Sequence, residues 1–429
     1  MTMLIDFSMT NFKSFKDETT LSAETGERLS RLKQTNTLNE NGYGLLKNLL
    51  IFGPNGSGKS NLLLGLRTMK QMVLTNPTKV TTQLPAQPFV LDEVSVHQPL
   101  YFAVTFNYQR TTYHYEFSYT KSAIVSEKLS IKETRGMRTY FERHQQEFLV
   151  LPANLVSLQT TTKPNTLLLF NAQQANDHHA AGVMAWFQSD LLFVDDAHLS
   201  EQLVAMLDQP IVKEEFLQFL HFADFNIVDI QTRQVATPRI PDQLLQLLQG
   251  GDGEVQLPET MPQIFAIHQK YNAAGEVVGQ EELPLASESQ GTQKIFVIGL
   301  SIINAQLNGN GKTLLFDEFD DSLHFELTKA LIKIFNSKAN KNQFILTTQE
   351  LQLLDSDLRT DQIYLVEKNF QGVSELNAIF DFSDTRMTAR RDVSFLKRYI
   401  EGRFGAMPTV NADEMLLALE ELSADGDRE

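Results

Sequence analysis

The sequence predicts an α/β fold with an antiparallel β lobe and a mostly helical insertion. Residues 260–405 alternate strand-like and helix-like segments, which is typical of a sheet covered by helices. Residues 49–66 run from an apolar strand through a glycine-rich turn into a helix, so the N-terminal part of the chain contributes to the same sheet. Residues 101–131 alternate apolar and polar side chains as an antiparallel meander does.

Four segments follow from these patterns in chain order. Residues 1–135 form the N-terminal part of the α/β unit, with strands predicted at 4–9, 11–15, 49–52, 101–106, 112–119 and 124–131. Residues 136–259 carry Gln and Leu at helical spacing and form the insertion. Residues 260–405 form the C-terminal part, with strands at 263–271, 313–316, 343–347 and 363–366 and helices at 294–307 and 323–335.

The last segment, residues 406–429, is predicted to be an acidic amphipathic tail helix. Asn411 suits its N-cap, and Glu414 follows three residues later, which matches a capping box. The apolar stripe of this helix either packs on its own protomer or is offered to another subunit.

Composition excludes several classes of protein. The chain has 429 residues, and 53 acidic against 37 basic side chains give a formal charge of −16, so no global positive field draws it to nucleic acid or anionic lipid. The absence of Cys excludes disulfides, thiolate catalysis and Cys-ligated metals. Apolar runs such as residues 45–52 are shorter than the roughly 18 residues that a membrane span needs. The start at Met1 lacks a signal-peptide pattern, and we expect a cytoplasmic protein without a membrane partner.

The strongest motif is a phosphate-binding loop. It reads G-x-x-x-x-G-K-S between a buried strand and a helix, which is the context that a P-loop requires. Glycine lets successive N–H groups converge on a phosphate, and the helix N-terminus adds its positive dipole. Lys59 is predicted to reach the β- and γ-phosphates, and Ser60 to bind Mg²⁺. The predicted nucleotide-binding residues here are Gly53, Pro54, Asn55, Gly56, Ser57, Gly58, Lys59, Ser60 and Asn61.

A pair of carboxylates ends a second buried strand, residues 313–316. Asp317 suits Mg²⁺ binding, and Glu318 suits a general base for an attacking water. Acidic pairs are also common on protein surfaces, but a P-loop in the same chain favours the catalytic interpretation. The segments Asn336–Ala339 and Asn340–Gln343 lack the Asp of a guanine-reading N-K-x-D motif, so ATP with Mg²⁺ is the predicted nucleotide.

A third motif precedes the long helix at 294–307. Ser289 and Gly291 form a Ser-x-Gly turn where hydroxyl, N–H groups and helix dipole can hold an anion. Such a turn alone is most often a helix cap. Its position about twenty residues before the acidic strand favours a functional role.

Together these motifs resemble the ATP-binding-cassette heads of the RecF, SMC and double-strand-break-repair ATPases, and more closely the AAA-type ATPases associated with bacterial abortive infection. The middle third of the chain carries no matching motif. The resemblance rests on NFKSF at 11–15, GPNGSGKSN at 53–61, ESQGTQK at 288–294, LLFDEFDDSLH at 314–324, FILTTQ at 344–349 and RRDVSFLKRYIEGRFGAMP at 390–408.

The resemblance implies an ATP sandwich. Ser289 and Gly291 of one protomer would contact the γ-phosphate held by the P-loop of a second copy, so that a homodimer, or a higher oligomer, completes each site. Residues 321–324 would form a D-loop across this interface, with His324 either contacting the interface or phosphate or serving a structural role.

Two glutamines are assigned through the same resemblance. Gln349 stands where such heads usually carry a His that contacts the γ-phosphate, and an amide can donate a hydrogen bond but cannot carry charge. We therefore expect slow hydrolysis, with Glu318, Lys59 and Gln349 as the catalytic residues, and we expect Gln349→His to raise turnover. Gln87 is predicted to complete the Mg²⁺ shell, although an exposed loop amide is the plainer alternative and Gln83 is equally polar.

Three functions are compatible with these features. The first is an ATP-hydrolysing sensor or clamp in bacterial antiphage defence that gates a co-encoded effector nuclease or toxin. The second is a RecF- or SMC-like DNA-binding ATPase of repair or recombination, and the third is an ATP-clamped scaffold with little turnover. Nucleic acid is not indicated by the net charge, but two local basic stretches, 128–143 and 386–403, could either bind it or serve structural roles.

Overall fold

The computed structural model describes residues 2–26, 29–194, 199–223, 226–237, 259–382, 394–405 and 413–417. A six-stranded sheet joins the two ends of the chain in the order β11–β15–β16–β5–β17–β18. The strands from β11 to β17 are parallel, and β18 pairs antiparallel with β17. Their bounds are Leu191–Val194 (β11), Thr313–Phe316 (β15), Gln343–Thr348 (β16), Asn48–Phe52 (β5), Ile363–Lys368 (β17) and Ser374–Ala378 (β18).

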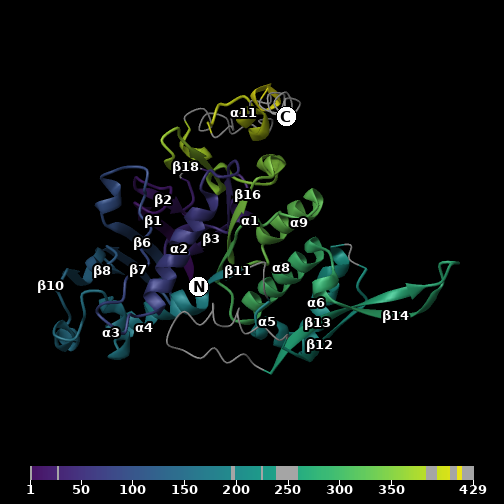
Figure 1. The fold of residues 1–429 in the computed structure, drawn as a ribbon, viewed down its shortest axis with the longest axis horizontal. Coiled ribbons are helices and arrows are strands. Elements are labelled where there is room, and N and C mark those ends of the chain that lie inside the picture. Colours follow the sequence, from purple (N-terminus) through teal and green to yellow (C-terminus); the bar gives the residue numbers. More distant parts are fainter. Residues whose placement is uncertain are drawn as a thin grey trace, which may run out of the picture.

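Both faces of this sheet are covered. α2 (Lys59–Leu74) lies between the parallel sheet and a larger antiparallel sheet, and its Leu62 and Leu66 share a core with Ile51 of β5. α8 (Gln290–Leu307) and α9 (Phe325–Phe335) pack on the opposite face, in a core that contains Phe52. Figure 1 shows α2 on one side of β16 and α8 and α9 on the other. Because successive strand residues point to opposite faces, the all-apolar run of β5 serves both cores.

The predicted antiparallel lobe is a seven-stranded sheet in the order β10–β9–β8–β7–β6–β1–β2. Its bounds are Glu147–Val150 (β10), Gly136–His144 (β9), Ile124–Glu133 (β8), Thr111–Tyr119 (β7), Leu100–Tyr108 (β6), Met3–Thr10 (β1) and Thr19–Ser22 (β2). The meander and the strand at 4–9 are confirmed. The strand predicted at 11–15 is wrong: Asn11 and Lys13 have φ of 55° and 49°, and the segment turns back on itself through a bridge between Phe12 and Phe15.

The predicted insertion, residues 136–259, contains strands as well as helices. Its helices are α3 (Leu168–Gln174), α4 (His178–Ala185), α5 (Glu201–Met206) and α6 (Pro210–Phe222). β9 and β10 extend the antiparallel sheet, and β11 extends the parallel sheet. β12 (Asp229–Ala236) pairs with β13 (Thr260–Tyr271), which pairs with β14 (Val277–Pro284). The boundary predicted at 135 falls inside the β8–β9 hairpin, and the division into four domains stays a prediction.

Among the described residues, the other α-helices and strands are short. They are α1 (Lys33–Asn36), β3 (Thr37–Glu40), β4 (Tyr43–Leu46) and α11 (Phe395–Ile400). Of the predicted tail helix, residues 413–417 are described and are helical, whereas Asn411 and the rest lie outside the described residues. Within the described ranges no helix is long and apolar enough to cross a membrane.

Candidate functional site

The glycine-rich loop joins β5 to α2 at the carboxyl edge of the parallel sheet. β5 is buried along its whole length and lies between β16 and β17. Gly58 caps α2 with φ of 121°, and Gly56 has φ of 76°. Side chains with a Cβ rarely adopt these angles, so glycine is required for the loop amides to turn toward one point.

Close packing behind the loop also requires glycine. A Cβ at Gly53 would lie 2.4 Å from the carbonyl oxygen of Val366 in β17. A Cβ at Gly58 would lie 2.5 Å from the hydroxyl of Ser374 in β18. Ser374 Oγ donates a hydrogen bond to the carbonyl of Ser57. The edge of the parallel sheet therefore holds the loop in a fixed shape.

A second support comes from the NFKSF turn near the N-terminus. Asn61 Nδ2 of α2 donates to Ser14 Oγ at 2.8 Å, and Ser374 N donates to Ser14 O at 2.7 Å. Asn61, predicted to bind nucleotide, is thus tied to this turn. Neither Ser14 nor Ser374 could be singled out as a support for the loop from local spacing, because their approach to the loop depends on the tertiary fold.

Lys59 is buried and folds over the loop. Its Nζ donates to the carbonyl oxygens of Gly53 at 2.7 Å and Pro54 at 3.2 Å. Burial lowers the pKa of Lys59, and the negative charges of Glu318 and Asp317 oppose that shift. The ammonium group is therefore held by the carbonyl oxygens of its own loop.

β15 delivers Asp317 and Glu318 to the same edge. Thr347 at the end of β16 donates through Oγ1 to Asp317 Oδ1 at 2.5 Å and accepts from Glu318 N at 2.7 Å. Glu318 has φ of 47°, and its carbonyl accepts from Lys294 Nζ of α8 at 2.5 Å. The sequence singled out neither Thr347 nor Lys294 as functional, since neither contact follows a local spacing rule.

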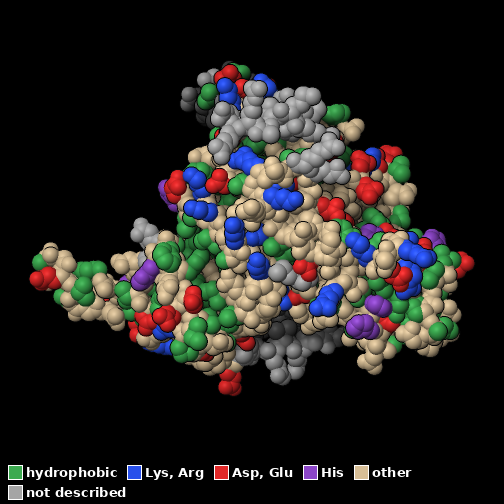
Figure 2. All heavy atoms as spheres, turned by 180° about the vertical axis from the view of Figure 1, so that it is seen from behind, with side chains coloured by type: hydrophobic (Ala, Val, Ile, Leu, Met, Phe, Trp, Pro, Cys, Tyr) green, Lys and Arg blue, Asp and Glu red, His purple; other side chains and the backbone are tan. Residues whose placement is uncertain are grey.

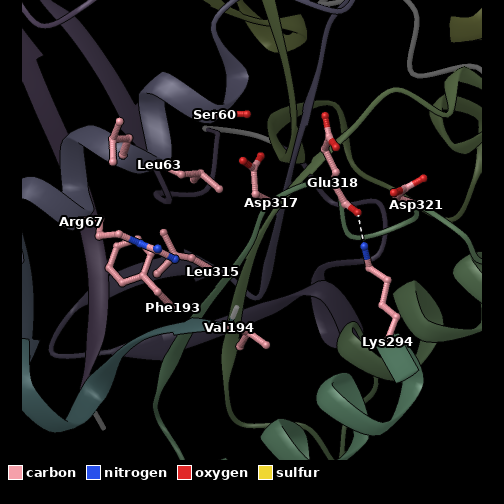
Figure 3. Close-up of a pocket in the computed structure, with 11 residues that line it drawn as sticks. Ser60, Leu63, Arg67, Phe193, Val194, Lys294, Leu315, Asp317, Glu318 and Asp321 are labelled. Carbon is pink, nitrogen blue, oxygen red and sulfur yellow. Dashed lines mark hydrogen bonds between the residues drawn. The ribbon is translucent and has the colours of Figure 1, made fainter. Parts of the chain in front are cut away.

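Ser60, Asp317 and Glu318 line one cavity of about 380 Å³. Figure 3 shows the Asp317 side chain directed toward Ser60, with Glu318 beside it. The described residues include no cluster of three or more acidic, His or Cys side chains that could hold a metal alone. Mg²⁺ in phosphate sites commonly takes one or two protein oxygens and completes its shell with phosphate and water, so Ser60 and Asp317 fit a magnesium–nucleotide complex.

Ser289 and Gly291 border a different hollow, of about 490 Å³, together with Ser322 and His324. Ser289 Oγ caps α8 by accepting from Thr292 N at 3.1 Å. His324 Nδ1 caps α9 by accepting from Glu326 N at 3.3 Å. Both residues therefore cap helices, which is the structural alternative that the sequence left open to binding phosphate or a partner. Both side chains are exposed.

The two predicted glutamines lie in different settings. Gln349 is the exposed first residue after β16, the strand between β15 and β5. Gln87 is also exposed, its backbone carbonyl accepts from Lys13 N at 2.8 Å, and it is not among the residues that line the cavity with Ser60. The structure places Gln349 at the carboxyl edge of β16, but Gln349 is not among the cavity-lining residues either, and the roles of both glutamines stay predictions.

Several cations of the basic stretch at 128–143 contact groups of the protein itself. Arg143 is buried and its guanidinium pairs with Glu127 at 2.8 Å. Arg138 pairs with Glu133 at 2.6 Å, and Lys132 Nζ lies 3.8 Å above the ring of Tyr43. These contacts favour the structural interpretation of this hairpin over nucleic-acid binding. In the second stretch, 386–403, residues 386–393 lie outside the described residues, and Arg403 pairs with Glu401 at 2.8 Å.

A phosphate-binding loop and an acidic strand end at one edge of a parallel α/β sheet define a P-loop ATPase. Residues 49–355, well over half of the chain, match the AAA_21 family, described as "AAA domain, putative AbiEii toxin, Type IV TA system". The protein belongs to this family.

Solved structures show a distant likeness. The SMC head domain from Thermotoga maritima is 15% identical with a TM-score of 0.40, covering 88% of this chain and 98% of that one. An SmcHead bound to the C-winged helix domain of ScpA is 12% identical with a TM-score of 0.41, covering 88% and 97%. An Smc head with an extended coiled coil, bound to the C-terminal domain of ScpA derived from Pyrococcus furiosus, is 11% identical with a TM-score of 0.41, covering 88% and 96%. No curated protein matches the chain.

Proposed function

We propose that this protein binds and slowly hydrolyses Mg-ATP at a site completed by a second copy, and that this nucleotide-controlled dimer gates an effector in bacterial antiphage defence. One observation carries the proposal: Ser60, Asp317 and Glu318 line one cavity, whereas Ser289 and Gly291 border another in the same chain. If the Ser289 turn binds a γ-phosphate, we propose that the nucleotide carrying it is held by the P-loop of a second copy of the chain.

The chemistry follows from the residues at the carboxyl edge. The loop amides and Lys59 would hold the phosphates, and Ser60 and Asp317 would hold Mg²⁺, which would supply positive charge to the phosphate oxygens when bound. Glu318 accepts a proton from a water whose oxygen attacks the γ-phosphorus, while the bond to the bridging oxygen breaks and its electrons remain on ADP. Gln349 donates a neutral hydrogen bond to the γ-phosphate, which supports slow turnover.

The biological part of the proposal rests on the family. Its description names an AbiEii toxin and a type IV toxin–antitoxin system, and both point to a system directed at the fate of the host cell. A regulated ATPase in such a system needs an output, and a co-encoded nuclease or toxin is the effector that we propose.

The assembly is tested by measuring mass in solution with and without Mg-ATP. Glu318→Gln should form a stable ATP-bound dimer, because binding is retained while the general base is lost. Ser289→Arg should bind ATP and stay monomeric, since the arginine side chain obstructs the turn facing the partner. Lys59→Ala should lose ATP binding. A Ser289→Arg protein that dimerises as readily as the wild type would contradict the composite site.

The cellular role is tested by phage infection. Lys59→Ala and Glu318→Gln should abolish protection, and intact protection in both variants would contradict the defence role. DNA binding that falls with salt and requires a slowly hydrolysed ATP analogue would instead favour the repair clamp. ATP binding without measurable turnover would favour the scaffold.

A further inference from the structure

We propose that Lys294 is a positioning residue that holds the backbone of Glu318 in the geometry needed for hydrolysis; this inference rests on the proposed ATPase function. Lys294 belongs to the second turn of α8 and is only 6% exposed. Its Nζ donates to the carbonyl oxygen of Glu318 at 2.5 Å, and Figure 3 shows this hydrogen bond along one wall of the cavity.

Glu318 needs such support because its backbone is in the left-handed region. Its φ is 47°, a conformation that costs free energy for a residue with a Cβ and that persists only where the surroundings enforce it. Thr347 Oγ1 accepts from the N–H of Glu318 at 2.7 Å, and Lys294 donates to its C=O. The peptide groups on both sides of the Glu318 Cα are therefore fixed by side chains from other elements.

The direction of the Glu318 side chain depends on this conformation. The Cα–Cβ bond is set by the backbone, so a return to the right-handed region would swing the carboxylate away from Ser60 and Asp317. A general base acts only within hydrogen-bond reach of its proton donor, and a displacement of about 1 Å can cost on the order of 100-fold in rate.

Lys294 also joins Glu318 to the turn that begins α8. In that turn Gln290 Oε1 accepts from Ser322 Oγ at 3.3 Å, and a Cβ at Gly291 would lie 2.6 Å from the Ser322 carbonyl. The first two turns of α8 thus contact the segment from Glu318 to Ser322 at both of its ends. A change in the position of α8, such as a partner pressing on Ser289, would be transmitted to Glu318 through Lys294.

The test compares Lys294→Met, which keeps length but removes the donor and charge, with Lys294→Arg, which keeps both. Lys294→Met should lower kcat about 10- to 100-fold with KM for ATP within about twofold of wild type, and Lys294→Arg should recover most of kcat. Lys329→Met, which removes an exposed lysine of α9, is the control for charge and should retain wild-type kcat.

A second readout needs no nucleotide. The Glu318 amide should exchange hydrogen faster in Lys294→Met than in wild type, at unchanged Tm, because its hydrogen bond to Thr347 loses support from the opposite side. A kcat within twofold of wild type, or a parallel fall in Tm and ATP binding, would overturn the positioning role. Absence of ATP binding in the wild type would overturn the proposed function itself, whereas the exchange comparison would still report on the contact.

Discussion

Gln349 is the single residue where this chain departs most clearly from the ATPase heads it resembles. It is exposed directly after β16, between the strand that carries Asp317 and the strand that precedes the P-loop. Gln349→His should raise kcat about tenfold, since a hydrogen bond from a charged donor exceeds a neutral one by roughly 1 kcal/mol or more. Steady-state turnover at saturating ATP measures this.

Gln352→His is the matched control for that prediction. Gln352 is exposed in the next turn of the same loop, so a histidine there changes composition without reaching the carboxyl edge of β16. Turnover in Gln349→His at or below the wild-type value would show that Gln349 does not contact the γ-phosphate.

The site residues divide by how far apart their partners lie in sequence. Lys59, Ser60, Asp317 and Glu318 could be predicted because each sits in a contiguous strand-and-loop pattern with its own spacing. Lys294 could not be predicted as a support for Glu318, because that contact depends on how α8 packs against the end of β15. Ser14, Thr347 and Ser374 were missed for the same reason: their partners lie 29 or more residues away.

At the scale of elements, the strands next to the recognisable motifs could be predicted from the sequence, whereas several strands outside those motifs could not. β5, β15 and β16 were predicted because their apolar runs are long enough for fully buried parallel strands. The NFKSF segment alternates like a strand, but positive φ at Asn11 and Lys13 folds it into a turn. β9 and β11 went unpredicted within the insertion, where the helical spacing of Gln and Leu dominates the pattern, although the apolar run of β11 is as long as that of β15.

The contact between α8 and the segment after β15 gives an element-level prediction. A Cβ at Gly291 would lie 2.6 Å from the backbone carbonyl of Ser322, which cannot move as a flexible side chain can. Gly291→Ala should push these segments apart and lower kcat at least tenfold, while ATP binding to the P-loop is retained. Fluorescent-nucleotide titration together with steady-state hydrolysis measures both quantities.

Gly279→Ala in β14 is the control for that substitution, because a Cβ there meets nothing within 4 Å. It should leave binding and hydrolysis unchanged. Equal hydrolysis in Gly291→Ala and wild type would show that the α8 turn tolerates displacement from the Ser322 segment.

At the scale of the whole molecule, acidic side chains outnumber basic ones by 53 to 37. The net charge is −16, and the face in Figure 2 mixes Lys and Arg side chains with uncharged and acidic ones. This distribution supports recognition of a nucleotide at a small local site over recognition of a long polyanion. The candidate nucleotide site lies at one edge of one sheet.

That edge is built from remote parts of the chain, and this predicts how the nucleotide acts on stability. β5 and its loop come from the N-terminal part, whereas both neighbouring strands and Asp317 come from the C-terminal part. A ligand that binds only the assembled site stabilises the whole fold by about 2.7 kcal/mol at a free concentration of 100 times its Kd.

Mg-ATP should therefore raise the Tm of Glu318→Gln. EDTA should remove most of this shift, because Ser60 and Asp317 are expected to act through Mg²⁺. Lys59→Ala should show no shift, and an equal shift in that variant would place nucleotide binding elsewhere in the molecule.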